Sequence, residues 1–310
     1  MNRLVQGSCL AFQLVLLLWL GATFTWWLGF AVFGGFLFLL IGLQFYLSRH
    51  FSDEQAGEIA AISMPQTMKL TQIQVWRASC QETVNCYRTF YFNQIFRVNG
   101  VWPAPLDNAK KIPVLLLHGF FCNRGLWVDF AADLVDQGHP CEGITMEPAF
   151  GSITDYARSI DVAIDALIAK TGASKIALVG HSMGGLAARS YLQDFGSNKI
   201  AKVITLGTPH QGTWLARFGH GANAKQMALS SDWLNALGQH EKQSGVGDLF
   251  TTILTWYDNI VFPQGKQSIP NAKLIAVTGM GHISMLFNSE VKDMVLKELA
   301  QVKEYEVSTR

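Results

Sequence analysis

Charge is the first thing that this sequence lacks. Only 15% of its 310 residues are charged, and its 24 basic side chains nearly balance its 23 acidic ones. This balance excludes the basic footprint that is typical of nucleic-acid-binding proteins. The low total and the positive mean hydropathy are unusual for a soluble enzyme, and the apolar excess lies at one end of the chain.

The shortage of charge is greatest near the N-terminus, where residues 4–48 contain no Asp, Glu, Lys or Arg. As one straight helix, this segment would be about 67 Å long, roughly twice the ~30 Å hydrocarbon core of a bilayer. We therefore predict an anchor over residues 1–50 that forms a hairpin of two transmembrane helices, about 5–21 and 28–47. Arg3 and Arg49 flank this hairpin and favour a cytoplasmic location for the rest of the chain, with a periplasmic location as the alternative.

The sequence also lacks any Cys-x-x-Cys pair, which excludes a zinc knuckle or a thioredoxin-like site. We expect no metal and no other cofactor. The spacing of Cys80 and Cys86 could support a disulfide in an oxidising compartment, but unpaired thiols are favoured. The full set of cysteines is Cys9, Cys80, Cys86, Cys122 and Cys141.

The remainder of the chain divides into a connector and a regular domain. Residues 51–110 form the connector, which we predict to be partly helical, although its aromatic part has no clear period. From residue 111 to 310, apolar runs such as "IPVLLLHG" and "KIALVG" alternate with amphipathic helical segments. This alternation predicts an α/β domain with a mostly parallel sheet and helices on both faces. An insertion at about 214–250 is predicted to be a cap or lid that either lines a pocket or covers the sheet.

Ser182 is the candidate nucleophile. It lies in Gly180-His181-Ser182-Met183-Gly184, between a predicted strand and a predicted helix, as a nucleophile elbow requires. Side chains at positions 180 and 184 would collide with the neighbouring strand and helix at such a sharp turn, and glycine avoids this. The N-terminus of the following helix would stabilise negative charge beside the serine.

A serine nucleophile needs a base and an acid that orients the base. His282 follows a predicted strand and a glycine loop near the C-terminus, where the last loop over the sheet would deliver a base. Asp258 lies at the tip of the run "FTTILTWY" and is the favoured acid. Asp248, before the same strand, is the alternative.

An oxyanion hole needs two preorganised backbone N–H donors. Met183 follows the nucleophile, and Phe120 follows His118 and Gly119 at the end of the first predicted strand. We expect His118 and Gly119 to shape this loop, with His118 as a second base being the less favoured alternative.

These motifs together resemble those of a known family. The stretches "LLLHGFF", "GHSMGG", "TLGTPHQGT", "YDNIVFP" and "GMGHISML" occur in the order found in bacterial α/β-hydrolase lipases and esterases. The chain is similar to their triacylglycerol-lipase-like branch over about residues 112–295. The resemblance implies the α/β-hydrolase fold, a triad of Ser182, Asp258 and His282, and an oxyanion hole at Phe120 and Met183.

We expect a serine hydrolase that is anchored in the bacterial inner membrane and cleaves carboxylic esters through an acyl-enzyme. Lipid or other acyl esters are the expected substrates, because the anchor would keep the site near the bilayer. A thioesterase or an acyltransferase with the same triad is the alternative. An inactive membrane scaffold with a hydrolase fold is the second.

Overall fold

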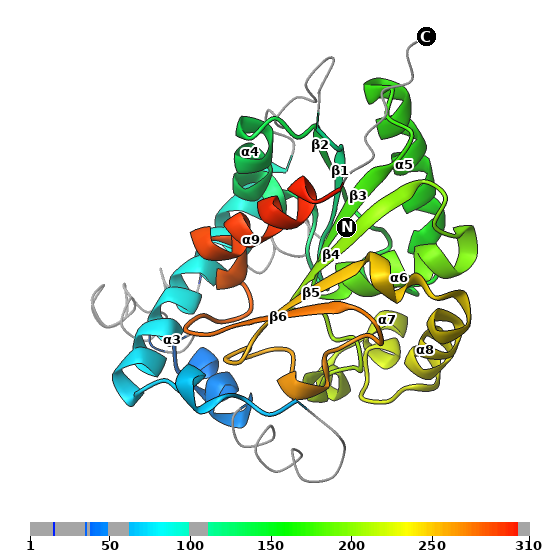
Figure 1. Cartoon of the computed structure of the whole chain (residues 1–310). Coiled ribbons are helices and arrows are strands. Elements are labelled where there is room, and N and C mark those ends of the chain that lie inside the picture. Colours follow the sequence, from blue (N-terminus) through cyan, green and yellow to red (C-terminus); the bar gives the residue numbers. More distant parts are fainter. Residues whose placement is uncertain (1–14, 16–34, 36–37, 49–61, 99–110, 303–310) are drawn as a thin grey trace.

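A six-stranded parallel sheet forms the centre of the protein (Figure 1). The computed structural model describes residues 15, 35, 38–48, 62–98 and 111–302. The strand order is β2-β1-β3-β4-β5-β6, and every neighbouring pair is parallel, which confirms the predicted sheet. The strands are β1 (Val114–Leu117), β2 (Cys141–Ile144), β3 (Ile176–His181), β4 (Ile200–Leu206), β5 (Phe250–Thr255) and β6 (Lys273–Val277).

Helices cover both faces of the sheet, as predicted. On β1, Leu115 and Leu117 join the core on one face, while Val114 and Leu116 join the core on the other. Because successive side chains of a strand point to opposite faces, a sheet buried on both sides needs continuous apolar runs. One face carries α4 (Val128–Asp136) and α9 (Ser289–Ala300), and the other carries α5 (Tyr156–Thr171), α6 (Met183–Phe195) and α8 (Asp232–Ser244).

The strand order reverses between β1 and β3, because β2 lies on one side of β1 and the strands from β3 onward lie on the other. In an open α/β sheet, ligands bind outside the carboxyl ends of the strands at such a switch point. The loops after β1, β3, β5 and β6 all emerge at this edge.

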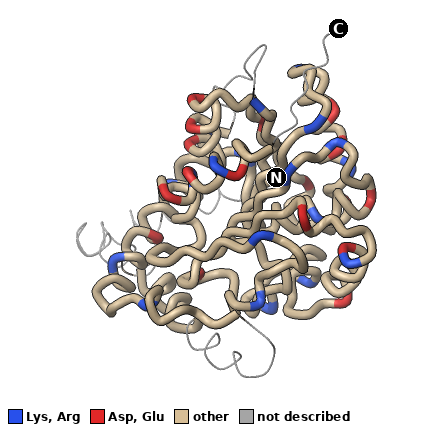
Figure 2. Tube along the Cα trace, in the orientation of Figure 1, with Lys and Arg blue, Asp and Glu red and all other residues tan. Residues whose placement is uncertain are grey.

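The predicted cap covers the sheet. It forms η4 (Trp214–Phe218), α7 (Ala222–Gln226), α8 and η5 (Val246–Leu249). Leu234 and Leu237 of α8 are buried in the core beside α6. Charged side chains of both signs are mixed over the described chain, in agreement with its balanced composition (Figure 2).

The described connector is helical, with η1 (Gln66–Met68), α3 (Gln72–Tyr87) and a π-helical continuation η2 (Arg88–Arg97). A capping box begins α3, in which the Thr71 side chain accepts from the Gln74 N–H and the Gln74 side chain accepts from the Thr71 N–H.

The burial pattern of α3 and η2 is the reverse of an ordinary surface helix. Their buried face is mostly polar and includes Glu82, Asn85, Asn93 and Gln94. Large apolar side chains point outward instead, namely Ile73, Trp76, Val84, Phe92 and Phe96. An amphipathic pattern is the main sequence signal for a helix that packs on a core, so this segment gave no clear prediction.

A helix at residues 38–48 packs on the end of β5. Ile41 and Phe45 are buried in a cluster with residues after β5, and the Ser48 hydroxyl donates to the backbone oxygen of Asp258 (2.5 Å). Its opposite side is apolar and exposed, with Leu39 at 70% and Leu43 at 51% exposure.

Nowhere in the described ranges is a helix both long enough and apolar enough to cross a bilayer. Most of the two predicted spans, 5–21 and 28–47, lies outside the described residues, so the hairpin stays a prediction. We did not predict from the sequence that one side of the helix at 38–48 packs against the end of β5.

Cys80 and Cys86 form no disulfide with each other and are free thiols on α3. Six residues of α-helix separate their Cα atoms by about 9 Å, which exceeds the ~7 Å limit for a disulfide. The favoured prediction of unpaired thiols is thus confirmed for this pair.

Candidate active site

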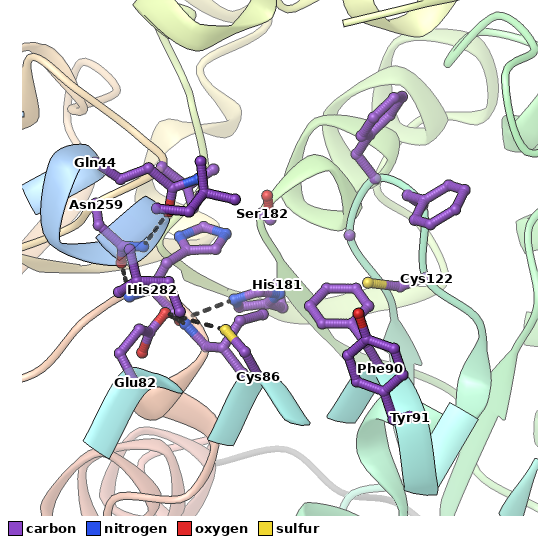
Figure 3. Close-up of a pocket in the computed structure, with 17 residues that line it drawn as sticks. Gln44, Glu82, Cys86, Phe90, Tyr91, Cys122, His181, Ser182, Asn259 and His282 are labelled. Carbon is purple, nitrogen blue, oxygen red and sulfur yellow. Dashed lines mark hydrogen bonds between the residues drawn. The ribbon is translucent and has the colours of Figure 1, made fainter. Parts of the chain in front are cut away.

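A cavity of about 490 Å³ opens at the carboxyl edge of the sheet (Figure 3). Its walls come from the helix at 38–48, from α3 and η2, and from the loops after β1, β3, β5 and β6. In the described part of the chain the lining residues are Leu40, Ile41, Gln44, Glu82, Cys86, Phe90, Tyr91, Gly119, Phe120, Phe121, Cys122, His181, Ser182, Asn259, Ile260, His282 and Ile283. The cap at 214–250 contributes none of these, so of its two predicted roles the structure favours covering the sheet.

Ser182 sits at the turn between β3 and α6 in a strained backbone conformation. Its φ of 55° and ψ of −126° are costly for a residue with a side chain, by about 1–3 kcal/mol. The turn is held by the Ser182 N–H, which donates to the carbonyl of Leu206 at the end of β4 (2.9 Å). Strain of this kind persists only where the surrounding structure fixes it, and it occurs often at functional sites.

The glycines around Ser182 are needed because backbone approaches them closely. A Cβ atom at Gly180 would lie 2.5 Å from the nitrogen of Gly185, and one at Gly184 would lie 2.0 Å from the oxygen of Leu117. A Cβ at Gly119 would lie 2.9 Å from the Cβ of Ser182. The steric reason given from the sequence for glycine at 180 and 184 is therefore present in the structure.

Asp258 and His282 form a buried pair. Asp258 Oδ2 lies 2.8 Å from His282 Nδ1, and both side chains are 3% exposed. The other carboxylate oxygen accepts from the N–H groups of Ile260 (2.9 Å) and Val261 (2.7 Å). With its proton on Nδ1, His282 presents Nε2 as an acceptor.

Asp248 is not part of this arrangement. It lies in η5, which precedes β5, whereas Asp258 follows β5. The two carboxylates are thus at opposite ends of the same strand, and only Asp258 reaches His282.

Neighbouring charges set the protonation of His282. Burial lowers the pKa of His282, but the charge of Asp258, the hydrogen bond to it and the charge of Glu82 together raise the pKa above its ordinary value. His181 behaves oppositely, because burial and the adjacent His282 hold the pKa of His181 well below its ordinary value. A neutral His181 thus lies beside a more basic His282, with the ring centroids 4.5 Å apart.

Ser182 and His282 border the same cavity, but no hydrogen bond joins their side chains among the described contacts. Catalytic hydrogen bonds are often long without substrate and shorten only in the complex.

His118 shapes the loop after β1. Its Nδ1 lies 2.8 Å from the carbonyl of Gly119, and its Nε2 accepts from the Met146 N–H (2.9 Å). Burial lowers the pKa of His118 to about 4, so the ring is neutral and both nitrogens are occupied. This geometry agrees with a structural role and disfavours a second base.

The predicted oxyanion donors lie on the two sides of the switch point. Phe120 lines the cavity after β1, and Met183 is the first residue of α6. The N–H of a first helical residue such as Met183 has no partner within its helix, as an oxyanion donor requires.

Residues of the connector and of the helix at 38–48 were missed from the sequence. Glu82, Cys86 and Gln44 line the cavity beside His282 (Figure 3). The sequence held one hint of this contact, the glycine at position 281. In the structure, a Cβ at Gly281 would lie 2.5 Å from the carboxyl carbon of Glu82. No group of three or more His, Cys, Asp or Glu side chains in the described ranges could hold a metal ion.

Comparison with known proteins agrees with this architecture. Residues 112–259 match the family described as alpha/beta hydrolase fold. Two triacylglycerol lipases, from Pseudarthrobacter phenanthrenivorans and Burkholderia plantarii, are each 31% identical over 118 residues, or 36% of this chain. The match spans 37% and 33% of the lengths of these relatives.

Solved structures share the same fold. The mature form of Bacillus licheniformis lipase BlEst2 has a TM-score of 0.55 at 16% identity and covers 64% of this chain and 95% of its own. Aspergillus fumigatus lipase B has a TM-score of 0.55 at 20% identity and covers 67% of this chain and 57% of its own. At these identities the likeness concerns the fold alone.

Proposed function

We propose that this chain, whose sheet domain has the α/β-hydrolase fold, is a serine hydrolase that cleaves carboxylic esters. One observation carries the proposal: a strained serine at the switch point and a buried histidine–aspartate pair border the same cavity. These are the nucleophile, base and orienting acid that acyl transfer requires.

In this mechanism His282 Nε2 takes the proton of the Ser182 hydroxyl as its oxygen attacks the ester carbonyl. Asp258 holds the imidazole through Nδ1 and stabilises the imidazolium. The N–H groups of Phe120 and Met183 stabilise the oxyanion of the tetrahedral intermediate. His282 then protonates the leaving alcohol, and water releases the acyl group by the same route.

The substrate class is a lipid or another acyl ester. The cavity walls are largely apolar, which supports binding of an acyl chain. The exposed large apolar side chains of the described residues also lie mostly before residue 98, and only Val162, Phe195 and Phe218 lie in 111–302. Because α3, η2 and the helix at 38–48 form both the cavity wall and this apolar surface, they would bring the site to a lipid surface.

Membrane attachment belongs to the same proposal. The uncharged segment 4–48 ends in a helix that packs beside the cavity, so an anchor within it would place the site at the bilayer. Arg3 and Arg49 favour a cytoplasmic catalytic domain.

Hydrolysis of p-nitrophenyl esters by the full chain and by Ser182→Ala tests the proposal. The variant should retain only the effect of binding and of the oxyanion hole, about 10³–10⁴ over water. More than a tenth of the wild-type turnover in the variant would exclude Ser182 as the nucleophile. The same assay with phospholipids and acyl thioesters separates an esterase from a thioesterase.

A further inference from the structure

Three consecutive backbone N–H groups of the loop that carries His282 are held by side chains from other elements. The N–H of His282 donates to Asn259 Oδ1 (3.0 Å). The next two, of Ile283 and Ser284, donate to Glu82 Oε1 and Oε2, each at 2.8 Å. Glu82 belongs to α3, so a helix outside the sheet domain holds the loop of the candidate base.

Glu82 is fully buried, and both of its carboxylate oxygens accept hydrogen bonds. A buried carboxylate is costly unless hydrogen bonds satisfy it, and here two backbone donors do so. Asn85, three residues further along α3, donates to the Ser284 hydroxyl (3.0 Å). The same turn of α3 thus contacts the loop through two side chains.

Gly281 leaves room for this carboxylate because it has no Cβ atom. A Cβ at position 281 would lie 2.5 Å from Glu82 Cδ and 2.6 Å from Glu82 Oε2. Real Cβ atoms do not approach so closely, so any other residue at 281 would push Glu82 or the loop away.

We infer that Glu82 is a positioning residue for the proposed general base: its carboxylate fixes the backbone of residues 283–284 and so sets the position of the His282 imidazole. The inference rests on the proposed function above. It extends the candidate site beyond the sheet domain, to a residue that precedes the nucleophile by about a hundred positions.

The titratable groups around His282 are Asp258, Glu82 and the neutral His181, and Cys86 lies next to Glu82. Burial raises the pKa of Glu82 above its ordinary value, and its hydrogen bonds to Ser284 and Ile283 and the charge of His282 offset part of this rise. An ionised Glu82 stabilises the imidazolium, as Asp258 does. Both carboxylates would therefore favour the protonated form of His282 that the proposed mechanism generates.

Glu82→Gln keeps the shape of the side chain and removes its charge and one acceptor. In the full chain in detergent, we expect kcat for a short soluble ester to fall by about 10- to 100-fold with little change in KM, as for a catalytic group displaced by ~1 Å. The acid limb of kcat/KM should also move to lower pH, because the neutral amide no longer stabilises the imidazolium. A purely structural role would lower the melting temperature and leave the acid limb in place.

Two further variants keep the inference testable if Glu82→Gln folds poorly. Gly281→Ala leaves the charge in place but crowds the Glu82 carboxylate and also Asn259 Oδ1, which would lie 2.8 Å from the new Cβ, so kcat should fall as well. Glu241→Gln is the matched control, because Glu241 is a buried carboxylate paired with Arg189 outside the cavity (2.6 Å). It should lower stability without moving the acid limb.

An acid limb that stays in place and a kcat within twofold of wild type in Glu82→Gln would overturn the inference. Failure of the inference about Glu82 must be told apart from failure of the proposed function. Titration of the His282 ring by NMR does this, because it does not depend on ester turnover. If the wild type and Ser182→Ala turn over esters equally, the proposed function fails. A lower His282 pKa in Glu82→Gln would still support the link between Glu82 and His282, and an unchanged one would refute it.

Discussion

His282 is the residue at which burial and charge oppose each other most directly. It lies in a nearly water-free environment that disfavours its charged form, yet Asp258 and Glu82 reverse this effect and raise its pKa. A base is useful only when it is neutral, so this balance sets the pH range of the site.

The first prediction is that kcat/KM falls on the acid side with an apparent pKa above 6.5, the ordinary value for histidine. The folded-state pKa is raised, so His282 stabilises the fold fully below about pH 6.5, and this contribution is lost as pH rises through the raised value. A pH–rate profile measures the limb, and Asp258→Asn should move it downward. An acid limb centred below pH 6 in the wild type would contradict the account.

The second prediction separates the two candidate acids. Asp258→Asn should lower kcat by about 10⁴-fold, because the amide no longer holds the required tautomer of the base. Asp248→Asn, at the far end of β5, should stay near wild type. Circular dichroism checks that both variants fold, and equal losses would show that Asp258 has no special role.

At the scale of elements, α3 and η2 bury polar side chains that such helices usually expose, and the helix at 38–48 adds Gln44 at the cavity. Glu82 and Asn85 face the site, and Gln44 accepts from Asn259, which in turn holds the N–H of His282. Apolar side chains such as Trp76 and Leu39 face outward. These elements therefore connect the site to an apolar outer surface, as proposed for a lipid-facing hydrolase.

The third prediction is that the helix at 38–48 stabilises the fold. Phe45 is 3% exposed and packs in the cluster with Leu254, Trp256 and Tyr257, so Phe45→Ala should cost about 3–5 kcal/mol of unfolding free energy. Leu43→Ala, on the exposed side of the same helix, should change stability by less than about 0.5 kcal/mol. Denaturation of both variants in the same detergent makes the comparison. A loss of unfolding free energy in Phe45→Ala as small as that in Leu43→Ala would mean that the packing of Phe45 contributes nothing.

At the scale of the whole molecule, the sheet domain was predictable because its signals are local. Each strand is an apolar run, and in a parallel sheet the residues that follow several strands meet at one edge. Ser182, Asp258 and His282 follow β3, β5 and β6, so their common edge could be expected from chain order. The contact of Glu82 with Ile283 spans 201 residues and depends on how α3 packs, which no local pattern encodes.

The fourth prediction concerns the orientation of the whole chain. With both ends of the proposed hairpin in the cytoplasm, green fluorescent protein fused after Arg310 should fluoresce, and alkaline phosphatase at the same position should be inactive. Active phosphatase would place the catalytic domain in the periplasm and require a different path for residues 4–48.

In the proposed mechanism, Ser182 is a nucleophile that is activated within this fold. Treatment of the full chain with a fluorophosphonate probe, followed by digestion and mass spectrometry, tests it most directly. We expect one adduct, on the peptide that contains Ser182, with labelling lost in Ser182→Ala and strongly slowed in His282→Ala. An unlabelled wild type, or an adduct on any other residue, would contradict it.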